Sequence, residues 1–293
     1  MTKNKTASAS RLFLLTDYAT IIYFIITGLA ILLFYGKVEN PLSHLGIRLT
    51  VISVLISLAL IDKKRKGILF FVRLFIPVVL LSYTYGDTAA LNGIFFPAPL
   101  DSYFIKADKL IFGFEPALRF SQKFNAKWFG EIMNAGYFSY YFMLLAVTLS
   151  YFFVLREKAE ESIFIIITSF YIYYVIFIAV PVVGPQFFYK PPESTPLHSG
   201  LFSGLVQWVQ KNWEHPTGAF PSSHVGMAII YLIMTYKDLK KLFFVLLPFT
   251  IIILFATVYV KAHYAVDVFA GILTAPFIYY ISKNIYQSKF FKY

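Results

Sequence analysis

The residues best suited to chemistry in this chain are two histidines, which lie 39 positions apart. His224 ends the segment Gly-Ala-Phe-Pro-Ser-Ser-His at 218–224, and His263 lies in Lys-Ala-His-Tyr-Ala-Val-Asp at 261–267. Asp267 follows His263 at i+4, so on a helix its carboxylate shares a face with the imidazole, about 5–6 Å away between Cβ atoms. A carboxylate beside an imidazole fixes the ring's tautomer and raises its basicity. The pattern predicts a His–His–Asp site for nucleophilic or acid–base catalysis.

The elements between the two histidines must bring them to one side of a membrane. From His224 the chain is apolar to Tyr236, turns through 237–241, and is apolar again over 242–260. Because a membrane span needs roughly 17–25 residues, a helix out and a helix back return His263 to the level of His224. Ionisable groups at such a boundary are usually functional.

Composition predicts the class of protein. The 293 residues are 58% hydrophobic and only 14% charged, with a mean hydropathy of +0.67, whereas soluble domains carry about 25% charged residues. We therefore expect an all-α, polytopic membrane helical bundle of about eight transmembrane helices. The predicted spans are 15–35, 47–61, 68–85, 131–155, 162–182, 221–236, 242–260 and 264–282.

The formal net charge of +11 is distributed like that of a membrane protein, which argues against a nucleic-acid partner. Short basic segments mark the cytoplasmic side of a membrane, and their lysines and arginines meet lipid headgroups. This predicts an integral membrane protein with cytoplasmic N- and C-termini and an extracytoplasmic or lumenal active site. Arg73, inside a span, is expected to snorkel to the cytoplasmic side. The 15 of 26 basic residues on that side are Lys3, Lys5, Arg11, Lys63, Lys64, Arg65, Lys66, Arg156, Lys158, Lys237, Lys240, Lys241, Lys283, Lys289 and Lys292.

The chain divides into two predicted parts. Residues 1–66 form two transmembrane helices with a cytoplasmic N-terminus, and 67–293 form the catalytic membrane domain. That domain has two long extracytoplasmic loops, 86–130 and 183–220, rich in aromatic residues and proline. The chain has no cysteine, which excludes disulfides and thiolate metal sites. The sequence predicts nothing about oligomeric state.

Pro221 is expected at the first position of a helix, with Ser222 and Ser223 in its first turn, where free N–H groups suit a phosphate. Other interpretations remain open. The serines are also ordinary capping residues, and the His263–Asp267 pair is also typical of a polar tie between membrane helices. Two histidines and an aspartate are a possible set of zinc ligands. Because Asp267 is placed to support His263, no third strong ligand is obvious, and we predict no metal and no cofactor.

The two histidine motifs together resemble the second and third signature motifs of the PAP2 (type 2 phosphatidic acid phosphatase) superfamily. The resemblance covers roughly residues 100–282 and is nearest to the inositol phosphorylceramide synthase and sphingomyelin synthase branch. The segment Ala-Asp-Lys-Leu-Ile-Phe-Gly at 107–113, with Asp108, is similar to a segment that precedes the core in that branch. The resemblance implies that the last six spans form a six-helix PAP2-like core.

The resemblance also implies roles for the site residues. His263 attacks phosphorus to give a phosphohistidine and is oriented by Asp267. His224 protonates the departing oxygen and then activates the incoming hydroxyl, without a metal. Ser222 and Ser223 contribute to the phosphate cradle.

The chain departs from the phosphatase members of the superfamily at the arginines that bind phosphate. A Lys-x6-Arg-Pro motif is not recognisable, and Ala256 and Thr257 occupy the positions of a Ser-Arg pair. A phosphoryl transition state needs cationic stabilisation. Lys261 is the nearest candidate for this charge, followed by Lys190 and Lys211 in the second long loop.

The predicted function is phosphatase or phosphotransferase chemistry on a membrane phospholipid or lipid phosphate. The missing arginines favour transfer of a phosphorylated headgroup, such as phosphoinositol, to a lipid hydroxyl in sphingolipid metabolism. The alternative in the same class is a plain lipid-phosphate or polyprenyl-pyrophosphate phosphatase. Two alternatives come from other classes of protein. One is a proton-coupled transporter that uses the His/Asp cluster as a relay, and the other is a non-catalytic assembly partner.

Overall fold

The computed structural model describes residues 12–190 and 200–288, and all regular secondary structure in this part is helical. The predicted all-α polytopic bundle is confirmed. The eight long helices are α1 (Leu15–Leu33), α2 (Pro41–Ile61), α3 (Gly67–Leu91), α6 (Lys127–Val154), α7 (Ala159–Ala179), α10 (Ser223–Asp238), α11 (Lys240–Tyr259) and α12 (Ala265–Gln287). The shorter ones are α4 (Asp101–Phe112), α5 (Pro116–Lys123), α8 (Pro185–Phe188) and α9 (Leu201–Asn212), with 3-10 turns at Tyr35–Lys37 and Arg156–Lys158. The basic residues counted at positions 3, 5, 11, 289 and 292 lie outside the described residues.

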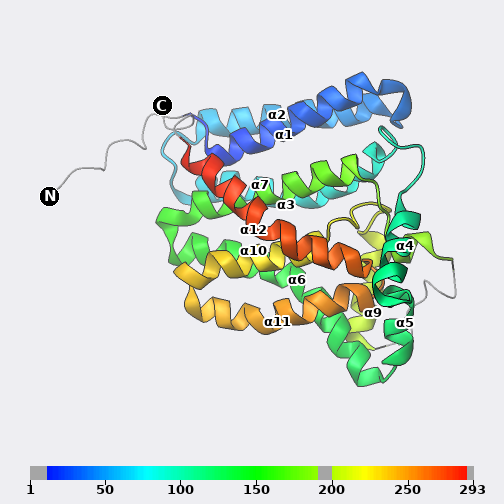
Figure 1. Cartoon of the computed structure of the whole chain (residues 1–293). Coiled ribbons are helices and arrows are strands. Elements are labelled where there is room, and N and C mark those ends of the chain that lie inside the picture. Colours follow the sequence, from blue (N-terminus) through cyan, green and yellow to red (C-terminus); the bar gives the residue numbers. More distant parts are fainter. Residues whose placement is uncertain (1–11, 191–199, 289–293) are drawn as a thin grey trace.

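Seven of the long helices in the described part are long and apolar enough to span a membrane. The remaining predicted span, 221–236, corresponds to α10, which has 16 residues, slightly less than the usual minimum of about 17. Figure 1 shows that α1 begins and α12 ends at the same end of the bundle, and that α10 runs along the bundle between its two ends. The chain returns to this end only after an even number of helices that run the length of the bundle. We therefore count α10 as the eighth such helix.

The centre of the bundle is α7. Within its span 78% of the residues are buried, against 17% for α2 at the periphery. A helix that is apolar all round belongs inside a bundle, and α7 packs against α1, α3 and α12. Glycine permits the closest helix contacts: a Cβ on Gly226 of α10 would overlap the Tyr173 hydroxyl of α7.

Arg73 does not snorkel, contrary to the sequence prediction. Its side chain is fully buried and pairs with Asp17 of α1 and, at 3.6 Å, with Asp62 after α2. One guanidinium nitrogen also donates to the Leu12 carbonyl at 2.8 Å. Because neighbouring helices bring carboxylates to the guanidinium, the charge is neutralised inside the protein.

The four short helices α4, α5, α8 and α9 gather at one end of the bundle, where α10 and α12 begin (Figure 1). They lie in the two predicted long loops, although α3 extends six residues beyond the predicted end of its span, to Leu91. Residues 191–199 of the second loop, with the prolines at 191, 192 and 196, lie outside the described residues. This helical cap surrounds the segments that carry the two histidines.

Candidate active site

The two histidines face each other at the capped end of the bundle. His224 lies in the first turn of α10, and His263 lies in the linker between α11 and α12. Nδ1 of His224 is 3.2 Å from Nε2 of His263, and the ring centroids are 5.4 Å apart with planes at 70°. The close approach expected from counting residues along the two helices is present.

A backbone carbonyl fixes the tautomer of His263. Nδ1 of His263 lies 2.7 Å from the carbonyl oxygen of Ala219. Because a carbonyl only accepts, Nδ1 carries the proton and the lone pair of Nε2 is left free to face His224. Burial lowers the pKa of His263 to about 4, against smaller raising effects from the Ala219 hydrogen bond and the charge of Glu214. The ring is therefore neutral at pH 7 and its Nε2 is available as a nucleophile.

Asp267 lies within ion-pair distance of His263 but beyond hydrogen-bond distance, with Oδ2 3.7 Å from Nδ1. This oxygen instead accepts the Tyr264 N–H at 2.8 Å, which caps the start of α12. The Asp267 carbonyl accepts the Ser222 N–H at 3.0 Å, so the residue also links the starts of α12 and α10. The other carboxylate oxygen, Oδ1, is buried without a hydrogen-bond partner among the described residues. The family resemblance implies that Asp267 orients His263 directly. In the structure the Ala219 carbonyl makes the orienting hydrogen bond instead.

Two tyrosines of α6 enclose the ring of His224. Tyr137 stacks on it with centroids 4.8 Å apart and planes at 28°, and Tyr140 lies 4.4 Å away at 46°. These ring contacts hold the imidazole of His224 in place beside His263. Sequence reasoning missed both residues, because among 22 tyrosines nothing distinguishes these two.

Glu214 is a further site residue that sequence reasoning missed. Its carboxylate accepts hydrogen bonds from the Tyr137 hydroxyl and the Gln186 side-chain amide, both at 2.5 Å. Burial raises the pKa of Glu214, while these two bonds and the charge of His263 lower it. A weak indication was available, since Glu214 precedes the first histidine motif by only four residues.

Two aspartates of α4 hold the segment that follows His263. Asp108 accepts the N–H groups of Ala265 and Val266, both at 3.0 Å, at the first turn of α12. Asp101, two helical turns earlier, accepts the Tyr264 hydroxyl at 2.9 Å. Burial raises the pKa of both carboxyls, against the lowering effect of these bonds. Asp108 lies in the segment identified by the family resemblance, whereas Asp101 was missed.

Asp101 also ties the start of the second long loop to the histidine linker. It accepts the N–H groups of Val183 at 3.0 Å and Gly184 at 2.9 Å. Gly184 has φ +89°, and a Cβ there would lie 2.7 Å from the Ala262 carbonyl oxygen. The Gln186 N–H donates to the Lys261 carbonyl at 2.9 Å. The close approach of these two chain segments therefore requires glycine at this position.

The two serines predicted to bind phosphate lie at the start of α10. Ser222 is its N-cap, with Oγ accepting the Val225 N–H at 3.4 Å. Ser223 is the first helical residue and hydrogen-bonds to Tyr140. Pro221 precedes the cap and is not the first helical residue as expected, because the Ser222 side chain accepts the cap bond one position further on.

The three predicted lysines differ in burial. Lys261 is 5% exposed and has φ +65°, so it lies inside the bend that leads to His263. Lys190 and Lys211 are exposed, and in the described part of the chain neither is found in contact with the histidines. Among the described residues, no three His, Asp or Glu side chains converge as metal ligands would. The phosphate-binding roles of all three lysines stay predictions.

Fold and site together define a class: a polytopic membrane protein with a part-buried histidine pair at one end of its bundle. The profile of the PAP2 superfamily matches residues 104–281, more than half of the chain, and the protein belongs to that superfamily. This agrees with the range of about 100–282 expected from the motifs. The match begins after α3, so it contains five of the six long helices predicted as the core. Searches of curated proteins and of solved structures each gave no match.

Proposed function

We propose that this protein cleaves a phosphate ester of a membrane lipid through a phosphohistidine on His263. One observation carries the proposal: Nε2 of His263, with its lone pair, faces Nδ1 of His224 at 3.2 Å while the Ala219 carbonyl occupies Nδ1 of His263. A nucleophile and an acid–base group are thus paired in one part-buried site. Membership of the PAP2 superfamily supports a phosphatase-type enzyme.

In the first step the Nε2 lone pair of His263 attacks phosphorus. The N–P bond forms and the P–O bond to the leaving group breaks, while protonated His224 gives its proton to the departing oxygen. Reacting atoms approach to about 3–3.5 Å before such a step. The facing nitrogens of the two imidazoles already lie at this distance from each other. The phosphate must therefore separate the two rings when it binds.

In the second step neutral His224 takes a proton from the acceptor, whose oxygen attacks the phosphohistidine. The P–N bond breaks and its electron pair returns to Nε2 of His263. The acceptor is water in hydrolysis and a lipid hydroxyl in transfer.

The charge of the phosphate needs partners throughout. The first turn of α10 presents backbone N–H groups without intrahelical acceptors, at the positive end of the helix dipole. Ser222 and Ser223 lie in this turn, and Lys261 would supply the cation. Asp267 lies 3.7 Å from Nδ1 of His263 and supports the linker by accepting the Tyr264 N–H.

We propose transfer to a lipid hydroxyl, as in the sphingolipid branch, as the specific reaction. The support is the replacement of the phosphatase Ser-Arg pair by Ala256 and Thr257, both fully buried in α11. The Thr257 carbonyl accepts the N–H groups of Ala262 and His263, at 3.0 and 3.1 Å, so this position supports the histidine linker without supplying a charge. A polyprenyl-pyrophosphate phosphatase remains the alternative.

The test uses purified protein in lipid bilayers with isotopically labelled phospholipids and ceramide or diacylglycerol. A new phospholipid indicates transfer, and free phosphate alone indicates hydrolysis. We expect His263→Ala to lower turnover by more than roughly a thousandfold and to abolish the alkali-stable, acid-labile protein phosphate. Full activity of His263→Ala would remove the proposed nucleophile.

A second variant separates the roles of the two histidines. In the first step, measured as the rate at which the protein becomes phosphorylated, we expect His224→Ala to be slowed on alkyl esters but much less on a nitrophenyl ester, whose leaving group needs no proton. Equal impairment on both esters contradicts the general-acid role. Proton flux across the bilayer without any chemical product would point to the transporter alternative.

A further inference from the structure

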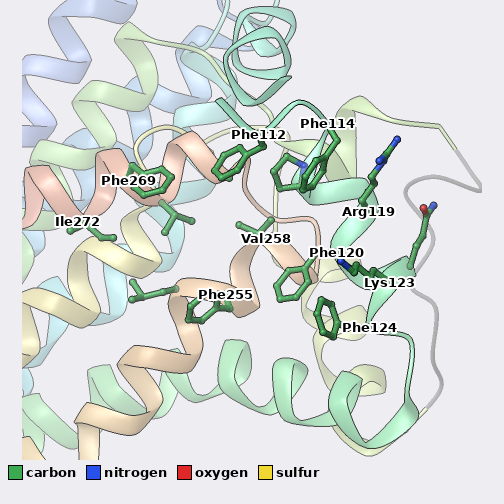
Figure 2. Close-up of a pocket in the computed structure, with 15 residues that line it drawn as sticks. Phe112, Phe114, Arg119, Phe120, Lys123, Phe124, Phe255, Val258, Phe269 and Ile272 are labelled. Atoms are coloured by element: carbon green, nitrogen blue, oxygen red, sulfur yellow. The ribbon is translucent and has the colours of Figure 1, made fainter. Parts of the chain in front are cut away.

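A cavity of about 740 Å³ lies between α5, α11 and α12. Figure 2 shows phenylalanines of all three helices around it, among them Phe120, Phe255 and Phe269. The volume is typical of sites for small molecules, about 300–1,000 Å³. Because α11 and α12 are candidate membrane spans, the cavity borders the acyl-chain region of a bilayer.

The cavity is separate from the histidine pair. Phe269 and Ile272 of α12 line it, whereas Gly271 faces α10, where its Cβ would lie 2.6 Å from the Ser222 carbonyl oxygen. The helix α12 thus presents one face to the cavity and another to the helix that carries His224. A molecule in the cavity does not occupy the place of the reacting phosphate.

One wall of the cavity is both aromatic and cationic. Arg119 and Lys123 lie at i and i+4 on α5, next to Phe120 and Phe124 (Figure 2). Within the described residues, no carboxylate forms an ion pair with either basic side chain, although Lys109 of the adjacent helix pairs with Glu115 at 2.7 Å. Two positive charges therefore stand at the edge of an apolar cavity.

We propose that this cavity is a binding site for an anionic phospholipid of the bilayer, distinct from the lipid that reacts. An acyl chain fills the space between Phe255 and Phe269, and the headgroup phosphate binds Arg119 and Lys123. Charge complementarity selects the anionic lipid, since each basic residue near an anionic headgroup strengthens binding roughly fivefold. A zwitterionic lipid gains little from the same two charges.

This site would regulate the reaction through the two helices that it joins. Val258 of α11 and Ala265 of α12 both line the cavity, and the linker between them carries His263. A bound lipid holds α11 and α12 at a fixed separation and so stabilises that linker. Activity is therefore expected to rise with the fraction of anionic lipid.

The experiment places a fluorescent probe in the cavity. Phe255→Trp protein is reconstituted in bilayers that contain brominated phosphatidylglycerol or brominated phosphatidylcholine at equal mole fraction. Fluorescence is corrected for Trp128, Trp208 and Trp213 with the unsubstituted protein. We expect the anionic lipid to quench the new tryptophan with roughly 25-fold higher relative affinity, fivefold for each of the two basic residues.

The matched variants test the cause of the preference. Arg119→Gln/Lys123→Gln should bring the two lipids to equal affinity. Lys106→Gln/Lys127→Gln removes the same charge from the same end of the bundle, outside the cavity, and should leave the preference intact. The preference should also persist with His263→Ala, since lipid binding here does not require the reaction. Equal quenching by both lipids in the Phe255→Trp protein would mean that only unselective annular lipid covers this face, and would overturn the proposal.

Discussion

At the scale of single residues, the ring of His263 combines a bound proton with a free lone pair. The Ala219 carbonyl holds the proton on Nδ1, and burial brings the pKa of His263 to about 4. The nucleophile therefore needs no deprotonation at neutral pH. The cost of this arrangement appears in the stability of the protein under acid conditions.

We predict that His263 destabilises the folded protein as the pH falls from about 6.5 to about 4. Between these values the unfolded chain binds a proton that the folded chain does not, so the contribution of His263 to stability is complete above pH 6.5 and lost on acidification. The loss at pH 4.5 is on the order of 2 kcal/mol. Thermal unfolding at pH 7 and pH 4.5 should show a smaller acid effect in His263→Phe than in the native chain.

The carboxyls around the site act in the opposite direction. Burial raises the pKa values of Glu214, Asp101 and Asp108, so these groups favour folding as the pH falls. The native chain and His263→Phe both contain these carboxyls, so the effects of the carboxyls largely cancel when the two proteins are compared. An equal acid effect in the two proteins would show that the pKa of His263 is not depressed.

We predict that Glu214→Gln shifts the acid limb of kcat/KM to lower pH. The charge of Glu214 raises the pKa of His263, so its removal lowers that pKa further. Tyr137→Phe is the control, because it removes the 2.5 Å hydrogen bond to Glu214 but keeps both the carboxylate and the ring that stacks on His224. A limb that moves to higher pH in Glu214→Gln contradicts the assignment.

At the scale of elements, α4 is the part that holds the histidine linker in place. Its two aspartates contact five hydrogen-bond donors, four of them backbone N–H groups. These donors belong to the segment 183–184 and to the start of α12. Small displacements of a catalytic group cost about a hundredfold in rate, so α4 should control kcat without touching substrate.

We predict that Asp108→Asn lowers kcat roughly tenfold and Asp108→Ala roughly a hundredfold, with KM nearly unchanged. Asparagine keeps one acceptor oxygen for the N–H groups of Ala265 and Val266, and alanine keeps none. The matched control is Glu131→Gln, since Glu131 accepts the N–H groups of Phe202 and Ser203 at the start of α9. A loss of kcat in Glu131→Gln equal to that in Asp108→Asn would indicate general destabilisation.

The elements also explain what was predictable from the sequence. Apolar segments have a length set by the membrane, so the spans and the meeting of His224 and His263 followed from counting residues. Glu214 and Asp101 were missed, because their partners lie on segments far away in the chain. Only the nearness of Glu214 to the first histidine motif gave a weak indication of its role. Arg73 illustrates the same limit. A lysine or arginine near a span end is free to snorkel, and only helix packing showed that Asp17 and Asp62 surround it.

At the scale of the whole molecule, the even number of long helices determines which segments share a side of the membrane. The turns after α2 and α10 lie at one end of the bundle, and the cap of short helices lies at the other (Figure 1). The basic residues of these turns, among them Lys64 and Lys237, favour the cytoplasmic side. The histidine pair would then face the extracytoplasmic or lumenal side.

The absence of cysteine allows a direct test of this sidedness with single-cysteine variants. Lys64, Asn125 and Lys237 are all exposed and lie in the turn after α2, between α5 and α6, and near the end of α10. We predict that Asn125→Cys reacts with a membrane-impermeant maleimide in intact cells, and that Lys64→Cys and Lys237→Cys react only after permeabilisation. Lys237→Cys tests α10 in particular: if this helix of 16 residues did not cross, position 237 would react together with position 125. Labelling of positions 64 and 237, but not of position 125, in intact cells would reverse the orientation and place the histidines in the cytoplasm.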